Sequence, residues 1–336
     1  MKAKIAILTF LSLACLIFFL IAGFNYVVDP MCYYRCEKLD TSKIHVNTYY
    51  HVGQIILAHP ETEAVMVGSS RGETTSALWL EKITGLKSLN LSVGGTELQA
   101  KIAFLNIALK NNRIKKVIWQ ADFFELIPEI IDVKMKSTEA LRAYLNEDFS
   151  ETAKVSLADQ VSSVIDHVTF EASVSRFKKK NQKPLDLGSG FDLKYELCEQ
   201  PDYEGEQTPE VFMKEIVTDW DRYRLSIFKH KASEKYWDLF VQKMKHLSSK
   251  SIDVTILIAP YSPIFMKNLA TELPDVFAAH QDWVKKLLAL QLPHIHIANF
   301  FAGIPGDDGS VRFWGDGVHF TCKGAIIMLK PSLGRQ

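Results

Sequence analysis

Short apolar runs alternate with segments of helical periodicity from residue 63 onward, and this alternation constrains the fold more than any other feature of the sequence. The runs predicted to be strands are 64–67, 88–91, 117–119, "SIDVTILIAP" and "HIHIANF". The segments predicted to be helices are 74–84, 97–111, 233–247 and 275–290. Short apolar strands separated by helices are typical of a parallel sheet covered on both faces. We therefore predict an α/β fold of three layers, α/β/α, with a mainly parallel sheet.

The alternation fails between residues 128 and 222. Stretches such as 156–168 have helical periodicity, whereas "RFKKKNQKPLDLGSG" has the composition of a polar loop. We interpret 128–222 as a largely helical insertion within one domain, 63–336. The charged run Lys178–Lys180 is most simply a solvated surface, and contact with anionic lipid or glycan is the alternative.

The N-terminus adds a second constraint. Ile5–Val28 is almost wholly apolar and uncharged, and about 20 such residues span the hydrocarbon core of a bilayer as a helix. A cleaved signal peptide has an apolar region of only ~7–15 residues before a small-residue cleavage site, and Ala22-Gly23 is a poor one. We predict an uncleaved membrane anchor over 1–30, followed by a juxtamembrane segment over 31–62.

Charge predicts the orientation and limits the partners. Lys2 and Lys4 precede the apolar run, and positive charge tends to remain cytoplasmic. We expect a single-pass protein of a bacterial-type cytoplasmic membrane, with its N-terminus inside and its body extracytoplasmic, that is, periplasmic. The 39 basic and 39 acidic side chains balance, which argues against a nucleic-acid partner, because such binders carry a basic excess.

Four cysteines lie beyond the apolar run: Cys32, Cys36, Cys198 and Cys322. An even number fits a compartment that permits disulfides. Four cysteines allow three pairings, among which the sequence does not choose, and four free thiols are an equal alternative.

A serine follows the first predicted strand in the stretch "VMVGSSRGE". Ligands of open parallel sheets bind beyond the carboxyl ends of the strands, so Ser70 would be presented at that edge. The helix N-terminus behind it favours developing negative charge, although a helix cap is the simpler role for a serine there. The pattern Gly-x-Ser-x-Gly also occurs in the nucleophile elbow of α/β-hydrolases, but that fold needs several strands before its serine.

An acid and a histidine lie three residues apart near the end of the chain, in "FWGDGVHFTCKG". A serine nucleophile needs a base to take its proton, and the base needs an acid to fix its tautomer. Asp316 and His319 would deliver both groups to Ser70 on one short loop. The alternative is that Asp316 caps the terminal helix and His319 packs in the core. We predict a catalytic triad of Ser70, His319 and Asp316 that needs no metal and no cofactor.

Three blocks, "VGSSR", "NLSVGG" and "DGVHF", occur in an order that resembles the SGNH (GDSL-like) hydrolase superfamily. With its N-terminal anchor, the chain is similar to the membrane-anchored branch that includes DltD-like and AlgJ/AlgX-like acyl-transfer proteins. The resemblance covers residues 60–125 and 250–325 and implies an SGNH/flavodoxin-like fold. It implies that Ser70 is the nucleophile, His319 the general base and Asp316 its orienting acid.

The resemblance also implies an oxyanion hole formed by the backbone N–H groups of Ser70 and Gly95, with Gly94 as the alternative to Gly95. The third family block usually supplies an Asn side chain as a further donor, whereas this chain has "WQADFFE". Gln120 could donate there instead, and an ionised Asp122 would repel the oxyanion. Loss of one donor typically costs about a hundredfold or more in rate.

Three further residues near these blocks are predicted to bind substrate. Arg71 would clamp an anionic substrate, or else form a surface salt bridge with Glu73. Asp122 and Trp314 complete the set, and Trp314 would stack on a sugar ring, although burial in the core is the commoner role for an aromatic side chain.

These features predict an extracytoplasmic serine acyl esterase or O-acyltransferase. Its expected substrate is an acylated glycan or another cell-envelope or exported polysaccharide. The resemblance implies that a membrane-bound partner could supply the acyl group for transfer. The alternative is a non-catalytic SGNH-fold scaffold or carbohydrate-binding component of an envelope polysaccharide assembly. The absence of the third-block Asn favours that alternative.

Overall fold

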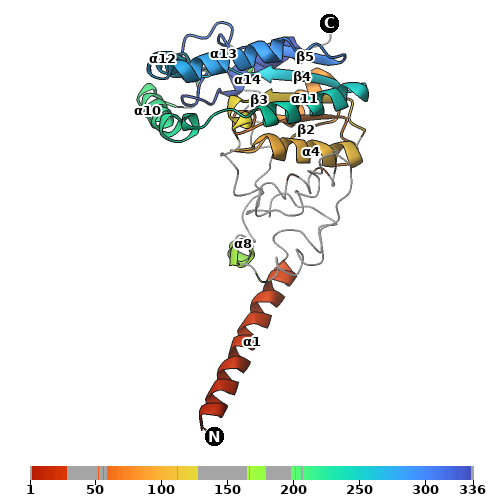
Figure 1. Ribbon diagram of the computed structural model, residues 1–336, viewed down its shortest axis with the longest axis vertical. Coiled ribbons are helices and arrows are strands. Elements are labelled where there is room, and N and C mark those ends of the chain that lie inside the picture. The colour runs from red at the N-terminus through yellow and green to blue at the C-terminus, as the bar shows by residue number, and fades with distance from the viewer. Residues whose placement is uncertain are drawn as a thin grey trace. The chain divides into compact units, whose positions relative to one another are not determined.

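The computed structural model describes residues 2–28, 52, 56, 59–111, 113–127, 165, 167–178, 198–200, 202–205 and 207–333. The chain divides into two compact units, of which Figure 1 shows the elements. One unit comprises Met1–Ala58 and Lys134–Leu187, and the other comprises His59–Val133 and Gly188–Gln336. Most of the predicted juxtamembrane segment and much of the predicted insertion lie outside the described residues.

The first unit contains α1 (Lys2–Val28) and, within the range predicted as an insertion, α8 (His167–Lys178). The ring of Phe24, near the end of α1, contacts the rings of Phe170 and Phe177 on α8. The centroids lie 6.0 Å apart in each pair. Aromatic contacts therefore join these two helices.

Helix α1 confirms the predicted apolar helix at the N-terminus. An 18-residue stretch within Lys4–Val28 has a mean hydropathy of 2.9, and the helix is long and apolar enough to cross a membrane, by length and composition. A signal sequence near an N-terminus shares these properties. The uncleaved anchor therefore stays a prediction.

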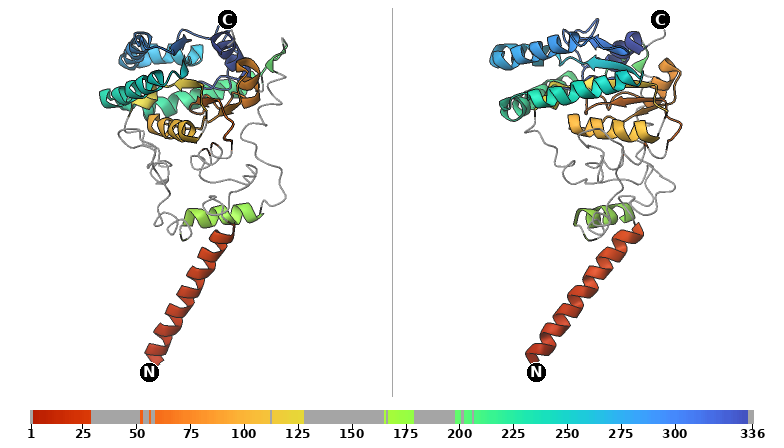
Figure 2. Two further views of the ribbon diagram at one scale, coloured as in Figure 1. Left: turned by 90° about the vertical axis from the view of Figure 1, so that its right-hand side faces the viewer. Right: turned by 45° about the vertical axis from the view of Figure 1, so that its right-hand side comes forward.

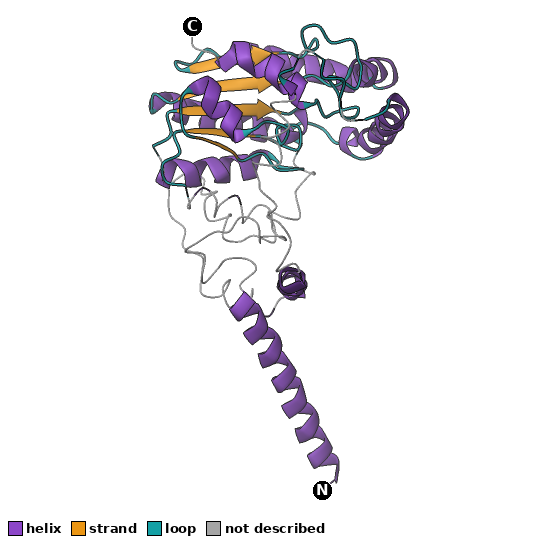
Figure 3. Ribbon diagram, turned by 180° about the vertical axis from the view of Figure 1, so that it is seen from behind, coloured by secondary structure: helices purple, strands orange, loops and turns teal. Residues whose placement is uncertain are grey.

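The described strands of the second unit form one five-stranded sheet in the order β2-β1-β3-β4-β5, with every pair parallel (Figure 3). The strands are β1 (Ala64–Val67), β2 (Ser88–Asn90), β3 (Lys116–Ala121), β4 (Asp253–Ile258) and β5 (Ile295–Asn299). This is the order of flavodoxin-like sheets, in which the winding reverses between β1 and β3. The sheet confirms the predicted α/β fold.

Helices cover both faces of this sheet, as Figure 2 shows. The helices are α3 (Ala77–Thr84), α4 (Leu98–Asn111), η2 (Phe123–Leu126), α10 (Pro209–Leu225), η4 (Ile227–Lys229), α11 (Glu234–Ser249), α12 (Pro263–Glu272), α13 (Pro274–Leu288) and α14 (Cys322–Leu333). Helices α3 and α14 pack together on one face, and α4 and α11 pack together on the other, as right-handed connections require. The arrangement is the predicted three-layer α/β/α fold.

Local capping explains the bounds of α3. The predicted helix 74–84 begins only at Ala77, because the Ser76 side chain accepts a hydrogen bond from the Trp79 backbone N–H and caps the N-terminus. Gly85 ends the helix in the left-handed conformation, with φ of 70°. Residues before Ser76 are thereby left in the turn that carries the candidate nucleophile.

Most of helix α10 lies in the range predicted as an insertion, yet the helix belongs to the same unit as the sheet. Thr208 caps the helix by accepting a hydrogen bond from the Val211 N–H, and Pro209 occupies the first turn. The Trp220 ring of α10 packs edge-on against Phe265 of α12, with centroids 5.3 Å apart. This part of the insertion therefore packs with the sheet-bearing unit.

A disulfide joins Cys198 to Cys322, the first residue of α14. Both cysteines are buried, and 124 residues separate them in sequence. The bond excludes the two pairings that would join either of these cysteines to Cys32 or Cys36, and Cys32 and Cys36 lie outside the described residues. Such a bond fits a body that folds in an oxidising compartment.

We expect this disulfide to stabilise the second unit. Replacing Cys198 and Cys322 together by Ala should lower the free energy of unfolding by about 2–4 kcal/mol, because a chain without the crosslink gains more entropy on unfolding. Circular dichroism of the full chain in detergent would measure this as a lower Tm. Cys15→Ser, at a free and exposed cysteine of α1, is the matched control and should leave the Tm unchanged. An equal Tm for the double variant and the wild type would contradict the prediction.

Candidate active site

Ser70 lies in the turn that follows β1, and glycines at both ends of the turn let it pass close to its neighbours. A Cβ atom on Gly68 would meet Gln120 Oε1 and Ser92 Oγ well inside van der Waals contact. A Cβ atom on Gly72 would meet the same two side chains. Glycine is therefore required at both positions, because the turn approaches Ser92, which follows β2, and Gln120, which belongs to β3.

The structure brings Ser70, His319 and Asp316 into one hydrogen-bonded chain, although 249 residues separate Ser70 from His319. His319 Nε2 lies 2.7 Å from Ser70 Oγ, and His319 Nδ1 lies 2.6 Å from Asp316 Oδ2. The side chains of His319 and Asp316 are 25% and 21% exposed, so solvent can reach them. With a proton on Nδ1 facing the carboxylate, Nε2 can accept the proton of the Ser70 hydroxyl.

Asp316 is held by the backbone of its own loop. Its Oδ1 accepts hydrogen bonds from the N–H groups of Val318, at 2.8 Å, and His319, at 2.7 Å. Burial acts to raise the pKa of Asp316, but hydrogen bonds from the His319 ring and from these N–H groups outweigh it and lower the pKa. The carboxylate is therefore ionised at neutral pH, as an acid that orients a histidine must be.

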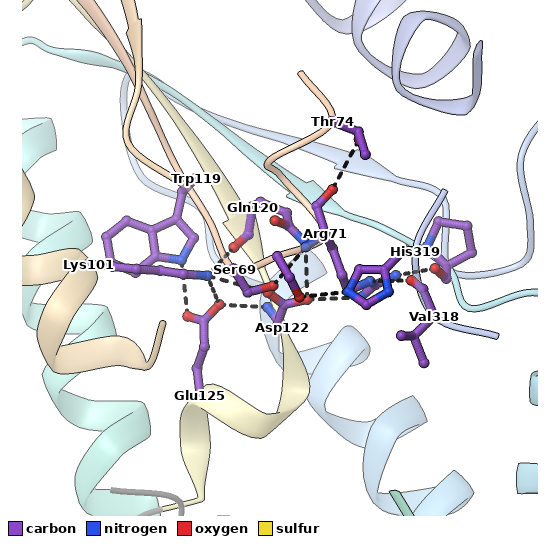
Figure 4. Close-up of polar contacts among 12 residues, drawn as sticks. Ser69, Arg71, Thr74, Lys101, Trp119, Gln120, Asp122, Glu125, Val318 and His319 are labelled. Atoms are coloured by element: carbon purple, nitrogen blue, oxygen red, sulfur yellow. Dashed lines mark hydrogen bonds and ion pairs between the residues drawn. The ribbon is translucent and has the colours of Figure 1, made fainter. Parts of the chain in front are cut away.

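Arg71 ties the serine turn to the loop that carries His319, as Figure 4 shows. Its Nη1 donates to Asp122 Oδ1 at 2.8 Å, and its Nε donates to the Val318 carbonyl at 3.0 Å. Its Nη2 donates to the Pro260 carbonyl. One guanidinium thus joins the turns after β1, β3 and β4 to the residue that precedes His319.

A second buried cation, Lys101, completes this network (Figure 4). Its Nζ donates to the Gln120 carbonyl at 2.6 Å and to the Glu125 carboxylate, and it lies 3.5 Å from Asp122 Oδ2. Burial raises the pKa of Glu125 to about 7, with Lys101 acting in the opposite direction. Asp122 therefore lies between two cations, Arg71 and Lys101, which offset its charge.

Arg71 and Asp122, predicted to bind substrate, lie inside the protein instead. Their side chains are 2% and 0% exposed and pair with each other. The predicted clamp on an anionic substrate and its alternative, a surface salt bridge with Glu73, are therefore both wrong for Arg71. The substrate-binding role predicted for Asp122 is wrong for the same reason.

Trp314 and Gln120 are fully buried as well. Trp314 Nε1 donates to Asp307 Oδ2 at 2.8 Å, and the ring belongs to the core, so the predicted stacking on a sugar is wrong. Gln120 Nε2 donates to Asp122 Oδ1 at 3.1 Å. This amide supports Asp122 and does not present a donor to the surface, contrary to its predicted role at the oxyanion.

The turn after β2 passes beside Ser70, as an oxyanion hole requires. A Cβ atom on Gly94 would lie 3.7 Å from Ser70 Cβ. The Gly94 N–H donates to Glu73 Oε1 at 2.5 Å. Gly95 is exposed and has a left-handed φ of 73°, a conformation that favours glycine. The roles predicted for the Ser70 and Gly95 N–H groups stay predictions.

Asp219 of α10 lies next to the Asp316–His319 pair. One carboxyl oxygen of Asp219, one of Asp316 and one ring nitrogen of His319 all lie within 4.8 Å of one another. This group could hold a metal ion, but the His319 nitrogens already make hydrogen bonds within the site. Asp219 Oδ2 accepts the Gly317 N–H at 3.3 Å, and Oδ1 accepts from Arg222 Nη2 at 2.6 Å.

Three charged residues of the site, Lys101, Glu125 and Asp219, were not among those predicted from the sequence. Lys101 carries a signal, because it is a charged residue in the largely apolar run "AKIAFLNIAL" of α4. Glu125 carries one too, because it stands three residues after Asp122 in a capping-box pattern at the start of η2. Asp219 carries none, since α10 has several charged residues and only tertiary packing places this one at the site.

No protein-family model and no curated protein matches this chain. Among solved structures, the chain is similar to a candidate platelet activating factor from Streptococcus pneumonia, with 10% identity and a TM-score of 0.37, over 85% of this chain and 91% of that one. It is also similar to a candidate acylhydrolase from Bacteroides fragilis NCTC 9343, with 10% identity and a TM-score of 0.32, over 81% and 86% of the two chains.

Removing the Arg71 guanidinium should destabilise the protein strongly, because Asp122 would keep a buried charge with less compensation. We expect Arg71→Ala to lower the free energy of unfolding by about 3–5 kcal/mol. Arg71→Lys should lower the free energy of unfolding by less than Arg71→Ala does. The loss remains because one ammonium cannot reach Asp122 and two backbone carbonyls at once. Thermal unfolding of the full chain in detergent measures both.

Arg224 is the matched control for Arg71. Its guanidinium pairs with Asp221 on the surface, at 2.8 Å. Such exposed pairs contribute about 1 kcal/mol or less, so Arg224→Ala should leave the Tm almost unchanged. Equal losses in Arg71→Ala and Arg224→Ala would show that the buried network does not stabilise the fold.

Proposed function

We propose that the protein is a serine acyl esterase or O-acyltransferase that acts through Ser70, His319 and Asp316. The observation that carries the proposal is the hydrogen-bonded chain from Ser70 Oγ through His319 to Asp316, with distances of 2.7 and 2.6 Å. A hydroxyl, an imidazole and a carboxylate in this order are the arrangement that activates a serine nucleophile. The hydrogen-bonded triad is open to solvent at the side chains of His319 and Asp316, where a substrate could bind.

The first half of the proposed reaction acylates the enzyme. His319 Nε2 takes the proton of the Ser70 hydroxyl while Oγ attacks the carbonyl carbon of an ester. A new O–C bond forms, and the carbonyl π electrons move to the oxygen as an oxyanion. The oxyanion then re-forms the carbonyl and expels the alcohol, which takes the proton from His319. The products are acyl-Ser70 and a free alcohol.

The second half returns the serine to its starting state. Water or a sugar hydroxyl gives its proton to His319 and attacks the acyl carbonyl, and Ser70 leaves with that proton. Attack by water makes the enzyme an esterase, and attack by a sugar hydroxyl makes it an O-acyltransferase. The ionised Asp316 stabilises the imidazolium of His319 in both halves.

Backbone N–H groups of Ser70 and Gly95 are the proposed oxyanion donors, with Gly94 as the alternative. Because Gln120 donates to Asp122, this hole would have two donors, and each missing donor typically costs about a hundredfold or more in rate. A slow enzyme is therefore expected.

We place the proposed reaction outside the cytoplasm, on an acylated envelope or exported polysaccharide. Helix α1 would anchor the protein, with Lys2 and Lys4 on the cytoplasmic side. The Cys198–Cys322 disulfide supports this side of the membrane, since such bonds persist in oxidising compartments. A membrane-bound partner would supply the acyl group if the enzyme is a transferase.

The proposal predicts covalent labelling of Ser70 by a fluorophosphonate, detected by mass spectrometry of the labelled peptide. Ser70→Ala should abolish labelling, and His319→Gln or Asp316→Asn should slow it by about 10³–10⁴-fold, because a triad without one member activates the serine poorly. Ser69→Ala is the matched control, because Ser69 is buried beside the nucleophile, and it should still be labelled.

The same experiment tests the alternative function. If the wild type is not labelled, or if labelling survives Ser70→Ala, the acyl chemistry is refuted. A non-catalytic scaffold or carbohydrate-binding component would then be favoured, as the absence of the third-block Asn suggests.

The anchor is tested separately in bacterial cells that express the full chain. Alkaline carbonate should leave the protein in the membrane pellet at its full mass, because an uncleaved span is not extracted, and protease added to spheroplasts should digest the body. Deletion of residues 2–28 should release the body from the membrane. A mature protein that begins after the apolar run would identify a cleaved signal peptide instead.

A further inference from the structure

The loop that carries His319 is packed tightly against α10 at Gly317. A Cβ atom on Gly317 would lie 3.0 Å from Phe265 Cδ2, 3.5 Å from Asp219 Cβ and 3.6 Å from Ile216 Cα. A larger residue would therefore push the loop away from α10 and α12. Glycine lets the loop approach closely enough for its N–H to donate to Asp219 Oδ2, at 3.3 Å.

Asp219 is only 5% exposed, and charged groups surround it. The titratable and charged groups that act on it are Asp316 and His319 of the loop and Arg222 of its own helix, while α12 presents the Phe265 ring. Burial raises the pKa of Asp219 to about 6, the charge of Asp316 adds to the rise, and Arg222 and His319 oppose it. Asp219 therefore holds a proton below about pH 6 and releases it above.

We propose that Asp219 is a positioning residue for the Asp316–His319 pair, a role that rests on the proposed acyl chemistry. It docks the loop onto α10 through the Gly317 N–H, and it gives Asp316 a second carboxyl group as a neighbour. In its protonated form, its O–H donates to Asp316. In its ionised form, its negative charge adds to that of Asp316 and stabilises the imidazolium that forms when His319 takes a proton.

Substitutions of Asp219 should lower kcat and leave KM almost unchanged, because Asp219 positions the base and not the substrate. With p-nitrophenyl acetate as the probe substrate and the full chain in detergent, we expect Asp219→Ala to lower kcat by about 10–100-fold, the scale of a small misplacement of a catalytic group. Asp219→Asn keeps an acceptor for the Gly317 N–H and removes the charge. It should match the wild type below about pH 6 and fall behind as the pH rises, because only the wild type then gains a charge.

Asp221 is the matched control on the same helix. It pairs with Arg224 at the same spacing as Asp219 with Arg222, but its side chain is 52% exposed. Asp221→Ala should keep kcat within about twofold of the wild type, as surface substitutions usually do. Similar losses for Asp219→Ala and Asp221→Ala would overturn the proposal.

A double-mutant comparison separates positioning from general structural support. Asp219 acts through Asp316, so Asp219→Ala should cost little further activity in an Asp316→Ala background. If Asp219 merely stabilised the fold, Asp219→Ala would lower the activity by the same factor in both backgrounds. That result would overturn the proposal. Circular dichroism of each variant shows whether it is folded.

A second readout does not depend on activity. The proton shared by His319 Nδ1 and Asp316 should give a far-downfield ¹H resonance, identified by its loss in His319→Gln. Asp219→Ala should shift or broaden this resonance, and Asp221→Ala should leave it in place. An unchanged resonance in Asp219→Ala would overturn the proposal. If the fluorophosphonate fails to label the wild type, the acyl chemistry fails, and the resonance still decides whether Asp219 positions the pair.

Discussion

The burial of the Arg71 guanidinium is the interaction on which the rest of the site depends. A buried charge is costly unless hydrogen bonds and an opposite charge compensate it, and Arg71 finds both in the Asp122 carboxylate and the carbonyls of Pro260 and Val318. These partners come from the ends of two neighbouring strands and from the loop that carries His319. Because the guanidinium is planar and its donors are fixed in direction, these segments can meet in few other ways.

The order of the strands brings the polar groups to one place. In a sheet of order 2-1-3-4-5 the winding reverses between β1 and β3, and ligands of such sheets bind beyond the carboxyl ends of the strands at that point. Ser70 follows β1 and Asp122 follows β3, so both stand at the reversal. Helix α10 and the disulfide-bonded start of α14 then border the loop that supplies His319. The helix from the predicted insertion is thus part of the site.

Local patterns predicted the elements well. The apolar run 64–67 coincides with β1, and the predicted helix 97–111 differs from α4 by one residue. The serine and the acid–base loop could be identified because each signal lies within a few residues. The interior was harder to predict. Arg71 and Trp314 carry polar atoms that suggest a surface role, yet both are buried and their donors are hydrogen-bonded. No local sequence pattern distinguishes a buried arginine or tryptophan from an exposed one.

The amino-acid sequence by itself determined the α/β class, the apolar N-terminal helix and the identity of the three residues proposed for catalysis, since each depends on periodicity or spacing within a short segment. Only the tertiary structure decided that Cys198 pairs with Cys322, that Arg71 faces the interior, and that Asp219 meets the His319 loop. These contacts join residues 124, 247 and 98 positions apart. Their formation depends on how whole helices and strands pack, and a short window of sequence carries no record of that packing.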